Sequence, residues 1–163
     1  MEKCNIDNEN NSIEVVGFLL NNDKNKEKYA IEVLYVEEVC FFKSITKLPC
    51  TPAFIIGIMN FRGKIISVID IRNFLEFTSK SIDCKDVKNI IVVKLNDIEF
   101  GIAADFILGC TKISMLEIQK DILHIENTKK HYFRGITREK NIILNIKNII
   151  LDKEIIIDEE NFQ

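Results

Sequence analysis

The chain has few of the residues that catalysis or metal binding requires. It contains only two histidines, His124 and His131, and no pattern of cysteines or acidic residues surrounds them at metal-site spacing. There is no glycine-rich phosphate loop, no G-x-S-x-G sequence and no serine in a recognisable nucleophile context. We therefore expect no catalytic residue, no cofactor site and no metal site.

Long apolar runs and long runs of positive charge are also absent. The longest apolar runs, such as residues 53–59, are far shorter than the roughly 20 residues of a membrane-spanning helix. Residues 1–14 are polar and acidic rather than a signal sequence. The net charge is −3 and no basic stripe occurs, so nucleic-acid binding has no support. We expect a cytoplasmic protein that neither inserts into the membrane nor binds nucleic acid.

Disulfide and metal-binding cysteine patterns are missing as well. No pair of cysteines has CxxC spacing, and an odd count without a secretory signal favours reduced thiols. The five cysteines are Cys4, Cys40, Cys50, Cys84 and Cys110.

Short apolar runs between polar turns make up most of the sequence. Hydrophobic residues form 47% of the chain, with isoleucine dominant, which is ample for one compact domain or two subdomains that share a core. The pattern predicts a mainly β fold. Strands are predicted over residues 15–20, 29–33, 39–42, 54–59, 64–69, 89–95, 98–103, 110–114, 133–137 and 141–144. Short helices are predicted over residues 34–38, 71–75, 104–108 and 146–151.

The two halves of the chain form an internal quasi-repeat. Tyr29-Ala30-Ile31 recurs as Phe100-Gly101-Ile102, and each is followed by a short turn and a strand. Gly57-Ile58 recurs as Gly135-Ile136, and each precedes a hairpin and a closing strand. The pattern predicts two copies of one five-stranded unit. Short strands of this kind favour small barrels, which close their own edges.

A β-hairpin is predicted between residues 48 and 72. Two apolar runs, residues 54–59 and 65–69, flank a short break. Gly63 can take the positive φ that a tight turn often needs, and Arg62 is left exposed at the tip. Asp70 is placed to cap the short helix that follows.

This hairpin resembles the signature of the CheW family, the coupling proteins of bacterial chemotaxis. The family pattern P-x-x-I-x-G-x-x-N-x-R-G-x-I-x-x-x-x-D-x-R is matched without gaps. The matching residues are Pro52, Ile55, Gly57, Asn60, Arg62, Gly63, Ile65, Asp70 and Arg72. The segments 29–39, 100–107, 132–136 and 142–146 are also similar to family segments, so the resemblance covers about residues 13–151.

The resemblance implies two small five-stranded SH3-like β-barrels packed side by side, with short helices. A single CheW-like domain would span residues 13–151, with strands exchanged between the barrels. Subdomain one would cover roughly residues 20–80, and subdomain two roughly residues 84–151 plus the N-terminal strand, with the polar run 78–88 as the crossing point. Residues 1–12 and 152–163 would be polar or acidic tails, although the apolar residues 155–157 are expected to pack back on the body.

The resemblance also implies a non-enzymatic adaptor recruited to membrane receptor arrays. It would couple the cytoplasmic tips of methyl-accepting chemoreceptors to the regulatory domain of a CheA-type histidine kinase. The partner-binding residues would be Val36, Glu38, Gly57, Asn60, Arg62 and Gly63.

Each of these residues also has a structural interpretation. Val36 and Glu38 face the same side if their segment is extended and diverge if it is helical. A side chain at Gly57 is expected to protrude beside the partner groove. Asn60 and Gly63 can serve only to shape the turn that aims Arg62.

Two other functions remain open. The chain can be a paralogous coupling module in a related pathway, such as surface motility or gene regulation. It can also be a small β-barrel enzyme or ligand-binding protein, which a concave apolar pocket with convergent polar groups would support.

Overall fold

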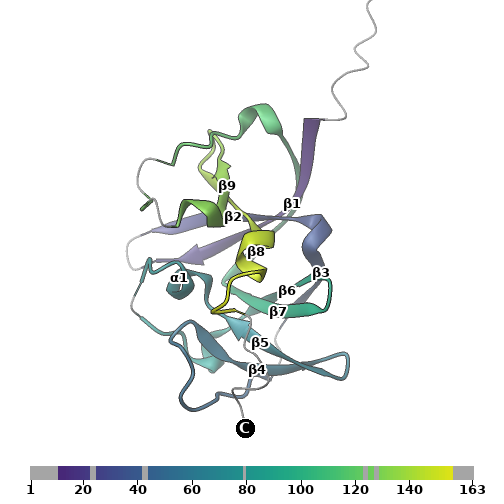
Figure 1. Cartoon of the computed structure of the whole chain (residues 1–163), viewed down its shortest axis with the longest axis vertical. Helices are drawn as coiled ribbons and strands as arrows, with labels where there is room; N and C mark the ends of the chain where they lie inside the picture. Colours follow the sequence, from purple (N-terminus) through teal and green to yellow (C-terminus); the bar gives the residue numbers. More distant parts are fainter. Residues whose placement is uncertain are drawn as a thin grey trace, which may run out of the picture.

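Ten strands in two sheets form the framework of the described chain (Figure 1). The computed structural model describes residues 11–22, 25–41, 44–78, 80–122, 125–126 and 129–155. Its strands are β1 (Ser12–Asn21), β2 (Lys26–Glu32), β3 (Val36–Phe41), β4 (Ile55–Phe61), β5 (Lys64–Ile69), β6 (Asn89–Leu95), β7 (Ile98–Ala104), β8 (Phe106–Ser114), β9 (Phe133–Ile136) and β10 (Asn141–Leu144). Its helices are α1 (Ile71–Phe74) and α2 (Ile146–Ile150), with the 3-10 turns η2 (Val33–Tyr35), η3 (Cys84–Asp86), η4 (Met115–Glu117) and η5 (Lys130–Tyr132). No helix in these ranges is long and apolar enough to cross a membrane.

The strands form two five-stranded sheets of matching topology. Sheet A has the order β8-β1-β2-β10-β9, and sheet B has the order β3-β6-β7-β5-β4. Each sheet contains one parallel pair, β2 with β10 in sheet A and β5 with β7 in sheet B. The predicted fold class, mainly β with two five-stranded SH3-like units and short helices, is confirmed, although the strand pairing of each sheet is open between its end strands.

The two sequence repeats exchange strands between these sheets. The first repeat supplies β1 to β5 and α1, and the second supplies β6 to β10 and α2. Sheet A combines the first two strands of the first repeat with the last three of the second, and sheet B does the reverse. Each sheet therefore depends on both halves of the chain.

The points at which the chain crosses between the sheets differ from the prediction. The segment 78–88 joins α1 to β6 within the sheet B half, so it is not a crossing point. The chain crosses instead at η2 and at Asp105, between β7 and β8. The sheets consequently do not follow the predicted boundary near residue 80, because β6 and β7 belong with β3 to β5.

The helix predicted over residues 104–108 is wrong. These residues end β7 and begin β8, whose Phe106 and Ile107 pair with Leu19 and Phe18 of β1. Pairing with a distant strand outweighs local helix preference, which is only a weak determinant. The helix predicted over residues 34–38 is likewise reduced to the turn η2, after which β3 begins at once.

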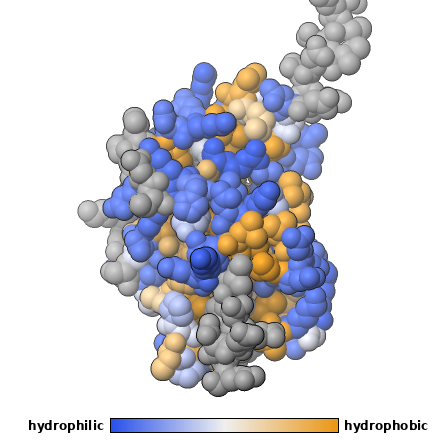
Figure 2. Space-filling model, viewed as in Figure 1, coloured by the Kyte–Doolittle hydropathy of each residue, from blue (hydrophilic) through white to orange (hydrophobic). Residues whose placement is uncertain are grey.

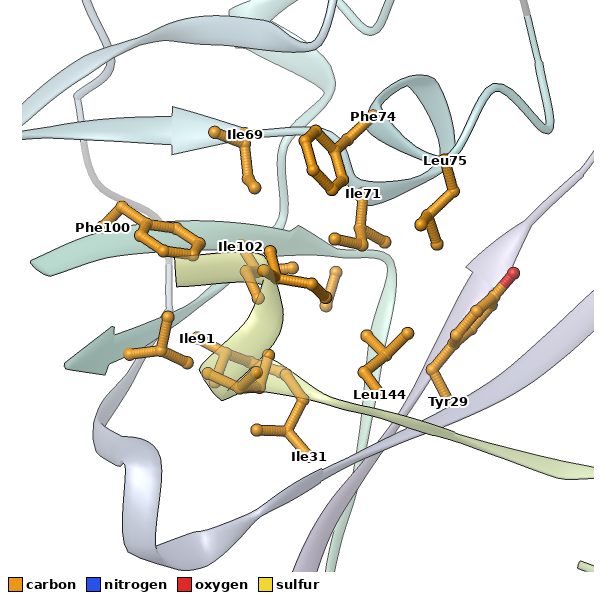
Figure 3. Close-up of a cluster of buried hydrophobic side chains, with 14 of the residues drawn as sticks. Tyr29, Ile31, Ile69, Ile71, Phe74, Leu75, Ile91, Phe100, Ile102 and Leu144 are labelled. Atoms are coloured by element: carbon orange, nitrogen blue, oxygen red, sulfur yellow. The ribbon is translucent and has the colours of Figure 1, made fainter. Parts of the chain in front are cut away.

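The largest hydrophobic cluster lies between the two sheets (Figure 3). It combines side chains from both sheets and both helices; those labelled in Figure 3 are Tyr29, Ile31, Ile69, Ile71, Phe74, Leu75, Ile91, Phe100, Ile102 and Leu144. Smaller clusters lie within each sheet, around Val68 and Val92 in sheet B and around Ala30 and Ile143 in sheet A. Because burial of apolar surface is the main stabilising term in folding, the shared cluster makes the two sheets one structural unit.

A buried ion pair fastens the start of α1 to sheet A. Asp70 is the N-cap of α1 and accepts a hydrogen bond from the backbone N–H of Arg72 at 3.0 Å, so the predicted cap is confirmed. Arg72 Nε also donates to Asp70 Oδ1 at 3.1 Å, and its Nη1 donates to the carbonyl oxygen of Asn21 and lies 3.6 Å from Asp105 Oδ2. Asp70 Oδ2 is buried without a hydrogen-bond partner among the described residues. Arg72 therefore supplies most of the charge compensation that Asp70 receives.

Candidate partner-binding surface

The tip of the β4–β5 hairpin is a tight turn with two residues of positive φ. Arg62 has φ of 50° and Gly63 has φ of 81°, the pattern of a type I′ turn. Asn60 Oδ1 accepts a hydrogen bond from the Gly63 N–H at 3.0 Å and closes the turn. Asn60 and Gly63 thus have defined roles in shaping the turn, and the structure places Arg62 at its exposed tip.

The side chain of Arg62 reaches across to β3. Its Nη2 donates to Glu38 Oε2 at 2.9 Å, and its Nη1 lies 3.7 Å from Glu37 Oε2. The guanidinium also lies over the ring of Phe61, 5.0 Å from the ring centroid. These contacts hold the guanidinium in one place, while 63% of the Arg62 side chain stays accessible. We refer to Glu37, Glu38 and Arg62 as the charged patch.

Val36 and Glu38 point to opposite faces of β3, although the segment is extended. A bulge between them shifts the pairing with β6. Val36 packs with Val39 against the central cluster, whereas Glu38 accepts a hydrogen bond from Cys40 Sγ at 3.7 Å. The expectation that an extended segment would place both residues on one side is therefore wrong, because the extra residue in the bulge reverses the alternation.

Gly57 is covered by backbone rather than open to solvent. A Cβ added at Gly57 would lie 2.4 Å from the carbonyl oxygen of Thr46, because this segment crosses β4 and pairs with Ile58. A side chain at Gly57 cannot protrude as expected without displacing this segment. Gly135 is covered in the same way, with the Gln119 carbonyl 2.5 Å from its added Cβ.

An apolar groove lies beside the β4–β5 hairpin, and its lining was not predicted from the sequence. It has a volume of about 470 Å³ and lies where the segment before β4, the strands β4 and β5, the β6–β7 turn and the residues after α2 meet. Its lining includes Leu48, Ile58, Ile65, Ile98, Phe100 and Ile155. Figure 2 shows apolar side chains gathered on this face over the region of β7. Ile65 is 65% exposed although it lies in a strand, and the apolar run 65–69 does not show from the sequence which of its residues faces solvent.

The charged residues that line the groove are acidic. Asp97 and Glu99 contribute to its lining, and the Glu99 carboxylate lies 3.8 Å from the Lys64 ammonium group. An apolar floor with an acidic margin fits an amphipathic peptide with basic residues at its edge better than an anionic ligand.

The tyrosines with shifted pKa values do not provide groups that titrate near neutral pH. Burial raises the pKa of Tyr29 far above its usual value, and the hydrogen bond that its hydroxyl donates to Glu27 raises the pKa further. Burial and the hydrogen bond donated to Asp152 raise the pKa of Tyr132 in the same direction. Among the described residues, no group of three or more histidines, cysteines or acidic residues could hold a metal ion, and His124 lies outside these residues.

A solved structure has a similar fold. The crystal structure of the scaffolding protein TtCheW from Thermoanaerobacter tengcongensis matches with a TM-score of 0.63 and 30% sequence identity, over 81% of this chain and 86% of that chain. The present chain thus has the fold of a bacterial scaffolding protein.

The family follows from the sequence comparison. The CheW-like domain model matches residues 14–154, and the chain belongs to this family. Relatives include the chemotaxis proteins CheW of Bacillus subtilis, 30% identical over 80% of this chain and 83% of the relative, and of Thermotoga maritima, 29% identical over 82% and 83%. The chemotaxis protein CheW of Treponema pallidum is 24% identical over 80% of this chain and 79% of that protein.

Proposed function

We propose that this chain is a non-enzymatic adaptor of bacterial chemotaxis that couples methyl-accepting chemoreceptors to a CheA-type histidine kinase. The observation that carries the proposal is the family match over residues 14–154, which spans both sheets. In this role the protein is cytoplasmic and is recruited to receptor arrays through its partners.

The charged patch is proposed as the contact for the regulatory domain of the kinase. Glu38 holds the Arg62 guanidinium by a hydrogen bond of 2.9 Å, and most of the Arg62 side chain remains accessible. A planar guanidinium fixed in this way loses little conformational freedom when it binds a carboxylate or carbonyl group. Asn60 and Gly63 support the contact by fixing the turn.

The apolar groove is proposed as the site for the helical tip of a receptor. An amphipathic helix presents apolar side chains at a spacing that fits such a groove. Ile65 and Ile98 supply apolar walls, and Glu99 supplies an acidic margin. Gly57 supports this region indirectly, because it allows the Thr46 segment to pass close over β4.

In the proposed mechanism the chain acts by holding its two partners in position, and it catalyses no reaction. Both surfaces involve sheet B, so one molecule can hold both partners at once at a fixed separation. Linking two partners through one adaptor raises their effective concentration, and a receptor state that binds differently can then bias the kinase.

Isothermal titration of the full chain against a receptor-tip fragment and a kinase regulatory domain tests this proposal. Ile65→Asp should weaken receptor binding by about ten-fold or more, because burying one aliphatic side chain is worth about 1.5–3 kcal/mol. Leu116→Asp is the matched control, since Leu116 is 83% exposed and lies in η4 outside the groove. If the unaltered chain binds neither fragment, the adaptor function is wrong. If it binds both but Ile65→Asp behaves like the control, the groove is not the receptor site.

A further inference from the structure

The pairing of the strands relates positions of sheet A to positions of sheet B. Ala30 and Gly101 hold the same place in the quasi-repeat. Ala30 lies opposite Gly17 of β1, whereas Gly101 lies opposite Val92 of β6. Gly17 therefore holds the place in sheet A that Val92 holds in sheet B.

Two polar residues of sheet A likewise stand where sheet B has large apolar residues. Asn141 corresponds to Ile66 through the parallel pairing of β10 with β2 and of β5 with β7. Thr137 corresponds to Met59, because each lies two residues after the backbone-covered glycine of its own repeat. The two repeats have thus diverged at three positions on one face of each sheet.

This divergence leaves a cavity in sheet A. In sheet B the three positions carry apolar side chains that are at most 4% exposed and belong to one cluster. In sheet A the three residues line a cavity of two lobes, with volumes of about 190 and 350 Å³. The lobes adjoin, since both are lined by Thr111, Ile113, Glu139 and Asn141. Cavities of this size accommodate small ligands.

Thr137 brings a buried hydroxyl group to the larger lobe. The residue is 6% exposed, and its Oγ1 accepts a hydrogen bond from the Asn141 N–H at 3.1 Å. The proton of this hydroxyl has no acceptor within the part of the chain that the structure describes. Because a buried donor without an acceptor is unfavourable, a ligand that accepts this proton would be stabilised at the site.

The two lobes differ in chemical character. Exposed charged residues of both signs line the larger lobe, namely Lys112, Glu117, Arg138 and Glu139. Apolar residues contribute to the smaller lobe, among them Val15, Ala30, Leu108 and Ile113. A ligand with one charge would meet two like charges at the larger lobe, whereas a ligand with both charges finds a partner for each.

We propose that this cavity binds a free α-amino acid with an aliphatic side chain. The aliphatic side chain enters the smaller lobe beside Gly17. The ligand carboxylate accepts the Thr137 hydroxyl proton and faces Arg138, and its ammonium group faces Glu117 and Glu139. The site belongs to sheet A, so it is separate from the two surfaces of sheet B that are proposed for the protein partners.

Nuclear magnetic resonance of the full chain, labelled with nitrogen-15 and without any partner, tests the site. Titration with L-valine should shift the amide signals of Gly17, Ala30 and Thr137 until they saturate, and the signals of the β4–β5 hairpin should not move. Isovalerate lacks the ammonium group of valine, and isobutylamine lacks its carboxylate. Each should bind at least about ten-fold more weakly, which is the contribution of one hydrogen bond to a charged group.

A cavity-filling variant locates the ligand. Gly17→Val copies Val92 of the other sheet, and its Cβ would lie 3.4 Å from the Cβ of Leu108, which is an ordinary contact. This variant should bind L-valine at least about ten-fold more weakly, because its side chain occupies the smaller lobe. Ser12→Val is the matched control, since it adds the same side chain to β1 at an exposed position outside both lobes.

Each result supports or overturns the proposal. Binding of L-valine that is lost in Gly17→Val and kept in Ser12→Val would support it. The proposal would be overturned if L-valine caused no saturable shift up to its solubility limit, or if isovalerate or isobutylamine bound equally well. Undiminished binding in folded Gly17→Val would place the ligand elsewhere and would also overturn it. If Gly17→Val does not fold, Asn141→Ile, which copies Ile66, should give the same loss.

Discussion

Reversal of the charges of Arg62 and Glu38 separates a contact role of Arg62 from a structural one. Three variants are needed: Arg62→Glu, Glu38→Arg and the combination of both. Each single change brings like charges together between β3 and the hairpin tip, where Nη2 and Oε2 are now 2.9 Å apart. The combined change restores an attractive pair at the same two positions.

The effect on stability should be small. The two side chains are 63% and 40% exposed, and exposed ion pairs contribute about 0.2–1 kcal/mol. Each single reversal replaces this attraction with a repulsion of similar size, so the free energy of unfolding should fall by about 1 kcal/mol. The combined variant should recover most of that loss.

The combined variant should not recover its affinity for the kinase regulatory domain. If the Arg62 guanidinium contacts a partner group that becomes buried, its reversal costs about 2–5 kcal/mol of binding free energy, and placing arginine at position 38 does not return the charge to the tip. Urea unfolding measures the first quantity and isothermal titration against the kinase regulatory domain measures the second. Lys112→Glu is the control, since Lys112 and Glu14 form an exposed pair at 3.8 Å in sheet A. Recovery of affinity together with stability would refute the contact role.

Three further predictions concern the fold. Gly57→Val should lower the free energy of unfolding by about 2 kcal/mol or more in urea titrations, because its Cβ meets the Thr46 carbonyl oxygen at 2.4 Å; an unchanged midpoint would mean that the crossing segment moves freely. Arg72→Met should cost about 3–5 kcal/mol in the same assay, because it leaves the Asp70 carboxylate buried without its cation; a near-neutral result would show that Asp70 is compensated in another way. Burial raises the pKa of Tyr29 above its ordinary value of 10.0, so only the unfolded state loses this proton as the pH rises above about 10, and stability should fall there. Tyr29→Phe should flatten that decline in thermal melts taken across the alkaline range, and an identical slope in both proteins would contradict the assignment.

Local patterns were enough to predict most strands but not their partners. β5, β6 and β10 have the predicted boundaries because polar turn residues limit each of them in the sequence. The start of β8 was missed because Phe106 and Ile107 are held by β1, far away in the chain. The exchange of strands was implied by the family resemblance, but the crossing at Asp105 depends on contacts with the end of β1: its N–H donates to the Leu19 carbonyl oxygen at 3.1 Å, and its carboxylate accepts from Asn21 N–H at 2.7 Å.

In the candidate site, too, local features could be predicted from the sequence, whereas contacts between distant segments could not. The exposed position of Arg62 and the turn made by Gly63 follow from the hairpin sequence itself. The pairing of Arg62 with Glu38 could not be predicted, because Arg62 lies in the β4–β5 turn and Glu38 lies on β3, which is not a neighbour of β4 or β5 in the sheet. A partner groove was expected, but its lining was not predicted, since the groove forms only where segments around residues 48, 65, 98 and 155 meet. The partner-binding role of the six predicted residues stays a prediction.

The exchange of strands has a mechanical consequence. Two linked barrels with one connection could swing about a hinge, but here the backbone passes between the sheets at η2 and again at Asp105, and the central cluster fills the space between them. A displacement of the hairpin tip must therefore move both sheets together as one rigid body. In the proposed adaptor role, such a body would transmit receptor movement by its own displacement or rotation, without bending.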